Sequence, residues 1–356
     1  MFYRFPTILV LVLKLLIYIQ LKSKAYKQIS NSNTLYLFTI FINVKIHLFY
    51  WISLGIVMCL PVTLEGQQEV TFSQYMFNHQ SLNPAYAGSK DYTHFAIIQR
   101  TQWSNFPGAP ESQAFTFNNK MSQKKFGFGL AGVNDKIGPM SSSRVALDLA
   151  YHLPIKDAFL AIGIKAGMSN FDFDESIIQT TTPDDMSFTF DEGGKFTPNI
   201  GFGIYYHRPR WYAGFSIPWF IENESLTIQK HYYGIVGGLV RITDDFQAKP
   251  SMLVKHTKGS AFGYDLSVLL LYRELFWIGP QTRSSFNQDV VPGTKFGGGF
   301  GMIAGVHLGK SISVGYSYNT SSLGKLINVN HATHEFMLRF DLIPVAKSML
   351  RSPRIF

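Results

Sequence analysis

Three short motifs in the chain contain residue types that could do chemistry. The first, Gly127-Phe128-Gly129-Leu130-Ala131-Gly132, has the glycine spacing of a dinucleotide-binding loop. In such a loop the glycines lie between a strand and a helix, and the helix N-terminus faces the pyrophosphate. Here the glycines stand within an alternating apolar segment, and Val133-Asn134-Asp135 follows as a predicted turn. We therefore interpret them as strand glycines on an inner sheet face, and we predict no nucleotide cofactor.

The second motif is Ala304–Ser311, which reads AGVHLGKS and lacks one glycine of a phosphate-binding P-loop. A P-loop follows a strand and opens a helix, and its lysine reaches the phosphates. The residues Ser311-Ile312-Ser313-Val314 instead begin another strand-like segment. Gly309-Lys310 is therefore predicted to be a hairpin turn.

The third motif is HxxHE, formed by His331, His334 and Glu335. Zinc peptidases instead place two histidines one helical turn apart around a catalytic glutamate. On a strand, neighbouring side chains point to opposite faces, so His334 and Glu335 cannot share a metal without a bulge. No Ser/His/Asp or Cys/His set stands out either. We predict no catalytic residues, no metal site and no cofactor, and thus a protein that is not an enzyme.

The net charge of the chain is concentrated near its start. Residues 1–66 hold six basic residues against Glu65 alone, a surplus of five, so the rest carries +4 of the total +9. That remainder is spread along the chain without a basic run. A nucleic-acid-binding protein concentrates its cations on one surface. We therefore predict no nucleic-acid partner.

Two apolar stretches, Ile8–Ile19 and Leu48–Leu64, precede the remainder of the chain. The second follows basic residues and ends before a polar start, as a secretory signal does. We predict that residues 45–66 are a signal peptide cut near Gly66. Residues 1–44 are then a mis-annotated upstream extension, and the alternative is a real pair of membrane anchors.

The one cysteine, Cys59, lies inside the second apolar stretch. A single cysteine excludes an internal disulfide framework. Lipidation would need a small residue before the cysteine, and Met58 is not small. Cys59 is therefore interpreted as an apolar residue of the signal core.

Three later segments, 144–153, 261–273 and 335–342, alternate strictly between apolar and other residues. In the last, one face holds Phe336, Leu338, Phe340 and Leu342, and the other holds Glu335, Met337, Arg339 and Asp341. Charges in all three segments fall on the non-aromatic face. A lipid-facing Arg or Lys near the midplane costs about 2–4 kcal/mol, whereas a charge facing a wet lumen costs little. This partition is typical of a membrane barrel, although a soluble sandwich could also show it.

The number and length of the strand-like segments decide between these two folds. Together with the three above, fourteen segments follow from alternation and turn signals, the others being Thr93–Trp103, Ala114–Met121, Lys125–Asn134, Phe159–Phe171, Asn199–His207, Trp211–Ile217, His231–Ile242, Phe246–Thr257, Phe276–Ser284, Lys295–Leu308 and Ser311–Tyr318. Many have the length of about ten residues that a tilted transmembrane strand needs. We predict an all-β fold, an antiparallel transmembrane barrel of about fourteen strands over residues 93–356, in the outer membrane of a Gram-negative cell and in contact with its lipid.

The segment of residues 67–92 differs from the strands. Its steps Asn83-Pro84 and Ala87-Gly88 signal turns, and its aromatic residues are too irregularly spaced for a strand face. We expect an ordered, non-strand segment that packs on something else. It could be a plug inside the barrel, a periplasmic contact, or merely a turn before the first strand.

This segment also carries a family resemblance. Residues 72–89 read FSQYMFNHQSLNPAYAGS, and further matches are the RTQW of 100–103, the PGAP of 107–110, the HEF of 334–336 and the terminal SPRIF of 352–356. The pattern resembles the PorP/SprF family, membrane proteins associated with the type IX secretion system and gliding motility of Bacteroidota. The resemblance covers roughly residues 67–356, and residues 1–44 have no counterpart in it.

The resemblance implies a fourteen-stranded outer-membrane barrel without enzymatic activity. Implied partners are the periplasmic motor and ring components of the secretion system and a secreted adhesin or other cargo with a C-terminal sorting domain. The implied role is to bind or anchor the exported protein and couple it to the machinery. Residues chosen as partner or lumen contacts are Phe72, Ser73, Gln74, Tyr75, Met76, Phe77, Asn78, Asn83, Pro84, Tyr86, Gly88, Arg100, Trp103, His334 and Glu335.

Two other functions compete with this one. Fourteen strands could enclose a diffusion channel for small solutes, unless side chains or the N-terminal segment fill it. An outer-membrane lipid hydrolase or acyltransferase would need a Ser/His pair at membrane level, and the sequence does not reveal one.

Overall fold

The computed structural model describes residues 69–343, except 105, 122–124, 175–194, 223–228, 259, 261, 286–298 and 321–331. The predicted upstream extension, the signal peptide, Cys59, His331 and the terminal SPRIF lie outside the described residues. The predictions made for them stay predictions.

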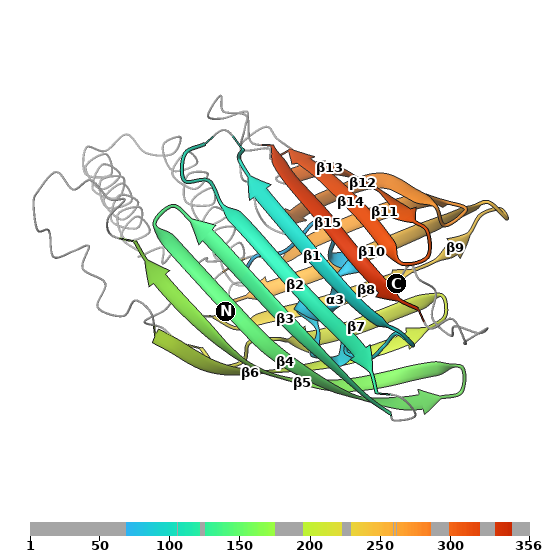
Figure 1. The fold of residues 1–356 in the computed structure, drawn as a ribbon, viewed down its shortest axis with the longest axis horizontal. Helices are drawn as coiled ribbons and strands as arrows, with labels where there is room; N and C mark the ends of the chain where they lie inside the picture. The colour runs from blue at the N-terminus through green and yellow to red at the C-terminus, as the bar shows by residue number, and fades with distance from the viewer. Residues whose placement is uncertain are drawn as a thin grey trace, which may run out of the picture. The chain divides into compact units, whose positions relative to one another are not determined.

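The described chain forms one antiparallel sheet that closes on itself (Figure 1). Its strands are β1 (Thr93–Gln102), β2 (Glu111–Lys120), β3 (Phe126–Ile137), β4 (Met140–Ile155), β5 (Ala158–Phe173), β6 (Lys195–Arg208), β7 (Trp211–Ile217), β8 (His231–Gly238), β9 (Val240–Arg241), β10 (Phe246–Thr257), β11 (Gly263–Tyr272), β12 (Phe276–Ser285), β13 (Gly299–Leu308), β14 (Ile312–Thr320) and β15 (Thr333–Leu342). Consecutive strands pair, and β1 pairs with β15 to close the barrel. Because β8 and β9 both pair with β10 and are separated only by Leu239, the fifteen strands make a barrel of fourteen. The predicted fold and strand number are confirmed.

The alternation of side chains sets the two faces of the barrel. On β15, Phe336 is 57% exposed and points outward, whereas Glu335 and Arg339 are fully buried and point inward. The same partition holds on β4 and β11, the other two strictly alternating segments. An apolar outer surface and a polar interior are what a bilayer requires of a barrel, because lipid offers no partner to polar groups.

Several strands run further than alternation predicted. Residues Met140–Ser143 of β4 pair with Asn170–Phe173 of β5 although they show no apolar alternation. The turn predicted at residues 133–135 is wrong, since β3 continues to Ile137 and turns at Gly138, whose φ is 57°. Backbone pairing with a neighbouring strand extends these segments where the side-chain pattern has already faded. The hairpin predicted at Gly309-Lys310 is confirmed between β13 and β14.

The two ends of the barrel differ in their connections. At one end, the short-turn end, β2, β4, β6, β9, β11 and β13 end and the strands that follow them begin. At the other, the long-loop end, β1, β3, β5, β7, β10, β12 and β14 end and the strands that follow them begin. In Figure 1 the short-turn end lies toward the right, where β9 is labelled.

The N-terminal segment lies inside the barrel as three short helical turns, η1 (Tyr75–Phe77), α3 (His79–Leu82) and η2 (Pro84–Tyr86). Asn83 lies between the last two and is the N-cap of η2, since its Oδ1 accepts a hydrogen bond of 2.9 Å from the backbone N–H of Ala85. We call residues 69–90 the plug. Within the described part of the chain, no helix is long and apolar enough to cross a membrane.

Candidate functional site: the plug and the barrel wall

The plug begins at the long-loop end with a carboxylate whose side chain is only 13% exposed. Glu69 forms an ion pair with Arg144 of β4 and accepts a hydrogen bond of 2.8 Å from the Tyr233 hydroxyl of β8. Its backbone N–H donates to Nε2 of His231 at 3.0 Å. Burial alone would raise the pKa of Glu69, but the charge of Arg144 and the hydrogen bond from Tyr233 outweigh it and lower this pKa. Glu69 is therefore an ionised carboxylate that ties the start of the plug to two strands.

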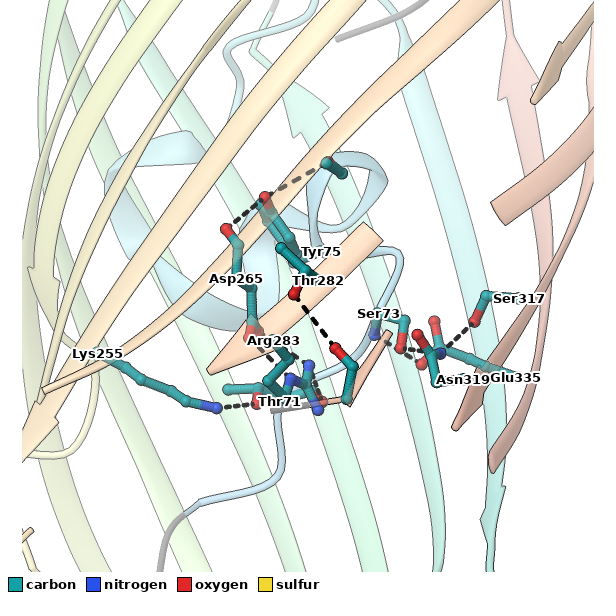
Figure 2. Close-up of polar contacts among 12 residues, drawn as sticks. Thr71, Ser73, Tyr75, Lys255, Asp265, Thr282, Arg283, Ser317, Asn319 and Glu335 are labelled. Carbon is teal, nitrogen blue, oxygen red and sulfur yellow. Dashed lines mark hydrogen bonds and ion pairs between the residues drawn. The ribbon is translucent and has the colours of Figure 1, made fainter. Parts of the chain in front are cut away.

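Charged side chains of the wall next hold the plug backbone at Thr71 (Figure 2). The guanidinium groups of Arg100 and Arg283 both donate to the Thr71 carbonyl, the latter at 3.1 Å. Nζ of Lys255 donates to the Thr71 hydroxyl at 2.8 Å. Asp265 balances this positive charge by accepting two hydrogen bonds from Arg283, at 2.8 and 2.9 Å. Three strands, β1, β10 and β12, thus converge on one plug residue.

A second carboxylate, that of Glu335, holds the following peptide units. Its two oxygens accept from the backbone N–H groups of Ser73 and Gln74 at 2.7 and 2.8 Å. Asn319 of β14 donates to the Ser73 hydroxyl at 2.8 Å (Figure 2). Hydrogen bonds to a charged acceptor are about twice as strong as neutral ones, and these are buried. The carboxylate thus satisfies two backbone donors that water cannot reach.

Further along, aromatic and cationic groups surround Phe77. Nζ of Lys249 donates to the Met76 carbonyl at 3.1 Å and lies 4.2 Å from the centroid of the Phe77 ring. Trp277 of β12 also contacts this ring, at a centroid distance of 5.1 Å, and the guanidinium carbon of Arg339 lies 5.9 Å from its centroid. A desolvated cation over a ring contributes about 2 kcal/mol. Apolar and charged contacts therefore hold the plug together at this level.

The middle of the plug contains a buried histidine. His79 shares a hydrogen bond of 3.1 Å with the Tyr205 hydroxyl, and its ring lies 4.5 Å from that of Tyr212. Burial, with the charges of Lys249 and Lys90, lowers the pKa of His79 well below its ordinary value. His79 is thus a neutral, packed side chain. Next to it, Gln80 hydrogen-bonds Asp148 of β4.

Glycines of the wall bring the plug backbone and the strands into direct contact. A Cβ added at Gly163 of β5 would lie 2.5 Å from the Ala85 Cα. One added at Gly88, whose φ is 72°, would lie 2.5 Å from the Gly127 Cα of β3. No side chain fits at such separations. The GxGxxG motif thus includes a glycine, Gly127, that leaves room for the plug backbone.

Most residues chosen from the sequence meet in this site. Buried plug residues among them are Phe72, Ser73, Gln74, Tyr75, Met76, Phe77, Asn78, Asn83, Pro84, Tyr86 and Gly88. Arg100 and Glu335 reach the plug from the wall. Trp103 follows β1 at the long-loop end, and His334 lies on the outward face of β15, bonded to the Tyr316 hydroxyl at 2.7 Å. The predicted opposite orientation of His334 and Glu335 is confirmed.

Sequence reasoning missed the other charged residues that join the plug and the wall. Glu69, Asp148, Lys249, Lys255, Asp265 and Arg283 all contact it or one another inside the barrel. Except for Glu69, each is a charge on the inward face of a strand. An inward-facing charge is the signal that could have found them, because a charge inside a filled lumen needs a partner.

A closed antiparallel barrel with an apolar outer surface and a charged, filled interior is a transmembrane β-barrel of the outer membrane. A family model described as type IX secretion system membrane protein PorP/SprF matches residues 64–340, which is more than half of the chain. The chain therefore belongs to the PorP/SprF family, as its motifs indicated. No curated protein matches the chain.

Solved structures with a similar fold share little sequence with this chain. The Acinetobacter baumannii outer membrane protein Omp33 has 8% identity and a TM-score of 0.43, with 72% of this chain and 100% of that chain covered. A mutant Rh. blastica porin has 7% identity and a TM-score of 0.33, over 70% and 99% of the two chains. The KdgM porin has 8% identity and a TM-score of 0.32, over 70% and 99%. The fold assignment rests on the strand pairing in the present structure.

Proposed function

We propose that this protein is a plugged scaffold of the type IX secretion system, which binds or anchors an exported surface protein and couples it to the periplasmic machinery. Family membership supports the secretion role. The observation that supports a scaffold is the plug itself, whose residues are buried within the barrel and bonded to strands around its circumference.

The plug argues against the alternative function, a diffusion channel. A fourteen-stranded barrel can enclose a pore only where its interior is not filled. Here charged groups of β1, β10, β12 and β15 bind one side of the plug, and glycines of β3 and β5 admit its backbone on the other. Displacing the plug would break these hydrogen bonds and expose apolar plug residues, such as Tyr75 and Met76, that the barrel buries. The wall and the plug therefore act as one body.

The direction of the plug assigns a role to each end of the barrel. Long loops of outer-membrane barrels face the cell exterior and short turns face the periplasm. Thr71 contacts residues near the long-loop ends of their strands, such as Arg100 and Lys255, whereas Gly88 contacts Gly127 and Asn118 near the short-turn end. The plug thus spans the lumen from the outer to the periplasmic mouth. We place the exported protein at the first and the periplasmic ring at the second.

Site-specific photocrosslinking in the native outer membrane tests this arrangement. A photoreactive residue would replace Phe106 at the long-loop end or Leu275 at the short-turn end, both 52% exposed, and Leu149 on the lipid face serves as control. We expect adducts with an exported protein at Phe106, adducts with a periplasmic component at Leu275, and no protein adduct at Leu149. Absence of protein adducts at both ends would contradict the proposal.

Conductance of the purified protein in planar bilayers tests the alternative. The plugged scaffold predicts no steady open channel. A steady open channel in the unmodified protein would favour solute diffusion instead.

A further inference from the structure

Basic residues mark every connection at the short-turn end of the barrel. Each of the six connections at the short-turn end contains or adjoins at least one of them: Lys125, Lys156, Arg210, Arg241, Arg273 and Lys310. Exposed cations thus recur on turn after turn along this rim of the barrel.

Part of this positive charge is neutralised within the protein. Arg241 pairs with Asp244, and Arg273 pairs with Asp245 through Nε at 2.7 Å. Asp157 likewise pairs with Arg208, the last residue of β6. The carboxylates of the turns are thus largely committed to neighbouring arginines.

Four exposed cations have no carboxylate partner among the residues that the structure describes. They are Lys125, Lys156, Arg210 and Lys310, which we call the basic rim. They come from the turns β2–β3, β4–β5, β6–β7 and β13–β14, so they are spaced along the rim from β13 through β1 to β7 and not gathered in one patch, and the remaining two turns hold the paired Arg241 and Arg273. A dispersed set suits many small anions better than one folded partner.

The outward aromatic residues beside these turns fix the depth of the basic rim in the membrane. Outward pairs at this end are Phe126 with Tyr151 and Tyr206 with Trp211, both with ring centroids 4.9 Å apart, and Phe246 with Tyr272 at 5.0 Å. Aromatic girdles of outer-membrane barrels lie at the membrane–water interface. Lys125 directly precedes Phe126 and Arg210 directly precedes Trp211. The basic rim therefore lies at the level of the lipid headgroups, which long basic side chains can reach.

We propose that the basic rim binds the phosphate groups of anionic phospholipids in the membrane leaflet at the short-turn end. The cations stand beside lipid-facing aromatics, are exposed, and follow the barrel perimeter, as headgroup contacts must. This inference concerns the lipid partner of the barrel and does not depend on the proposed cargo.

Lipid retention by the full-length folded protein tests the proposal. The protein is reconstituted with equal amounts of phosphatidylglycerol and phosphatidylcholine, and the lipids that remain bound after gentle extraction are counted by native mass spectrometry. The quadruple variant K125Q/K156Q/R210Q/K310Q is compared with the unmodified protein. The double variant K156Q/K310Q is compared with K136Q/K258Q, which removes two exposed lysines at the long-loop end.

We expect the unmodified protein to retain phosphatidylglycerol preferentially. One basic residue near an anionic surface contributes about 1 kcal/mol, which corresponds to about a fivefold preference. The preference of the quadruple variant for phosphatidylglycerol should therefore be at least about fivefold lower than that of the unmodified protein. K136Q/K258Q should retain the preference, and high salt should weaken it in the unmodified protein. Equal retention by the quadruple variant and the unmodified protein would overturn the proposal. The proposal would also be overturned if the quadruple variant kept its lipid retention but lost the protein crosslink at Leu275, since the rim would then bind a protein.

Discussion

The contact between Gly163 and the plug yields the sharpest prediction about this barrel. A Cβ at position 163 would lie 2.5 Å from both the Ala85 Cα and the Pro84 carbonyl carbon. Optimal carbon–carbon separations are about 3.5–4.0 Å, so Gly163→Ala requires a backbone shift of about 1 Å. Because both obstructing atoms are backbone, no rotation of a side chain relieves the overlap. Overpacking of this kind costs about 1–3 kcal/mol, which corresponds to a shift of about five- to 150-fold toward a displaced plug.

Hydrogen exchange followed by mass spectrometry measures this shift. In Gly163→Ala, amides of the plug peptide over residues 75–90 should exchange faster by the same factor, while the strands of the barrel keep their protection. Gly234→Ala is the matched control, since a Cβ at that glycine of β8 meets nothing within 4 Å. We expect this control to behave as the unmodified protein. Unchanged plug exchange in Gly163→Ala would refute the close approach of η2 to β5, and equal acceleration in both variants would show that the effect is not specific to the plug.

Three further perturbations test the polar contacts of the plug. Glu335→Ala leaves two buried backbone donors without an acceptor, at a cost of about 1–3 kcal/mol. The temperature at which the folded barrel loses its SDS-resistant mobility should therefore fall, and it should fall less in Glu335→Gln. Burial first, and then the charge of Arg339, lowers the pKa of Lys90 to about 7, so the unfolded chain binds more protons than the folded one above that pH. Stability should therefore rise as the pH is raised from about 7 to 9, and Lys90→Met should reduce this rise; a flat profile in the unmodified protein would refute it. Glu69→Gln removes the ion pair with Arg144. A reporter thiol at the start of the plug should then react faster with a membrane-impermeant reagent. An unchanged reaction rate would contradict this role of Glu69.

The faces of the strands were predictable from the sequence because one rule governs each strand. On β15 every outward residue from Phe336 to Leu342 is apolar or aromatic, and Glu335, Arg339 and Asp341 face inward as predicted. Lipid on one side and the polar lumen on the other impose a period of two, which needs no knowledge of the partner strand. The number of strands followed from the same signal.

The plug contacts could not be read in the same manner. Ser73 meets Glu335 across 262 positions of sequence, and Tyr75 meets Asp265 across 190. Successive parts of the plug face several different strands, so no periodicity links the plug to its partners. The irregular spacing that excluded a strand there indicated an ordered segment but not its contacts. Strand ends were missed for a related reason, since Ser141–Ser143 are held by pairing with β5 and not by a side-chain pattern.

The glycines of β3 show why a nucleotide-like motif occurs in a barrel wall. A dinucleotide loop needs glycine where its backbone must approach a phosphate too closely for a Cβ. Gly127 and Gly129 meet the same requirement toward a different neighbour, since they face the backbone at Gly88 and the side chain of Gln80. Both positions lie on the inward face of β3, two residues apart, as a strand dictates. Gly132 is on the other face and meets only Arg144 O, at an ordinary 3.8 Å. The motif therefore combines two glycines that admit the plug with one that does not, and its resemblance to a phosphate loop arises from close backbone approach and not from a shared ligand.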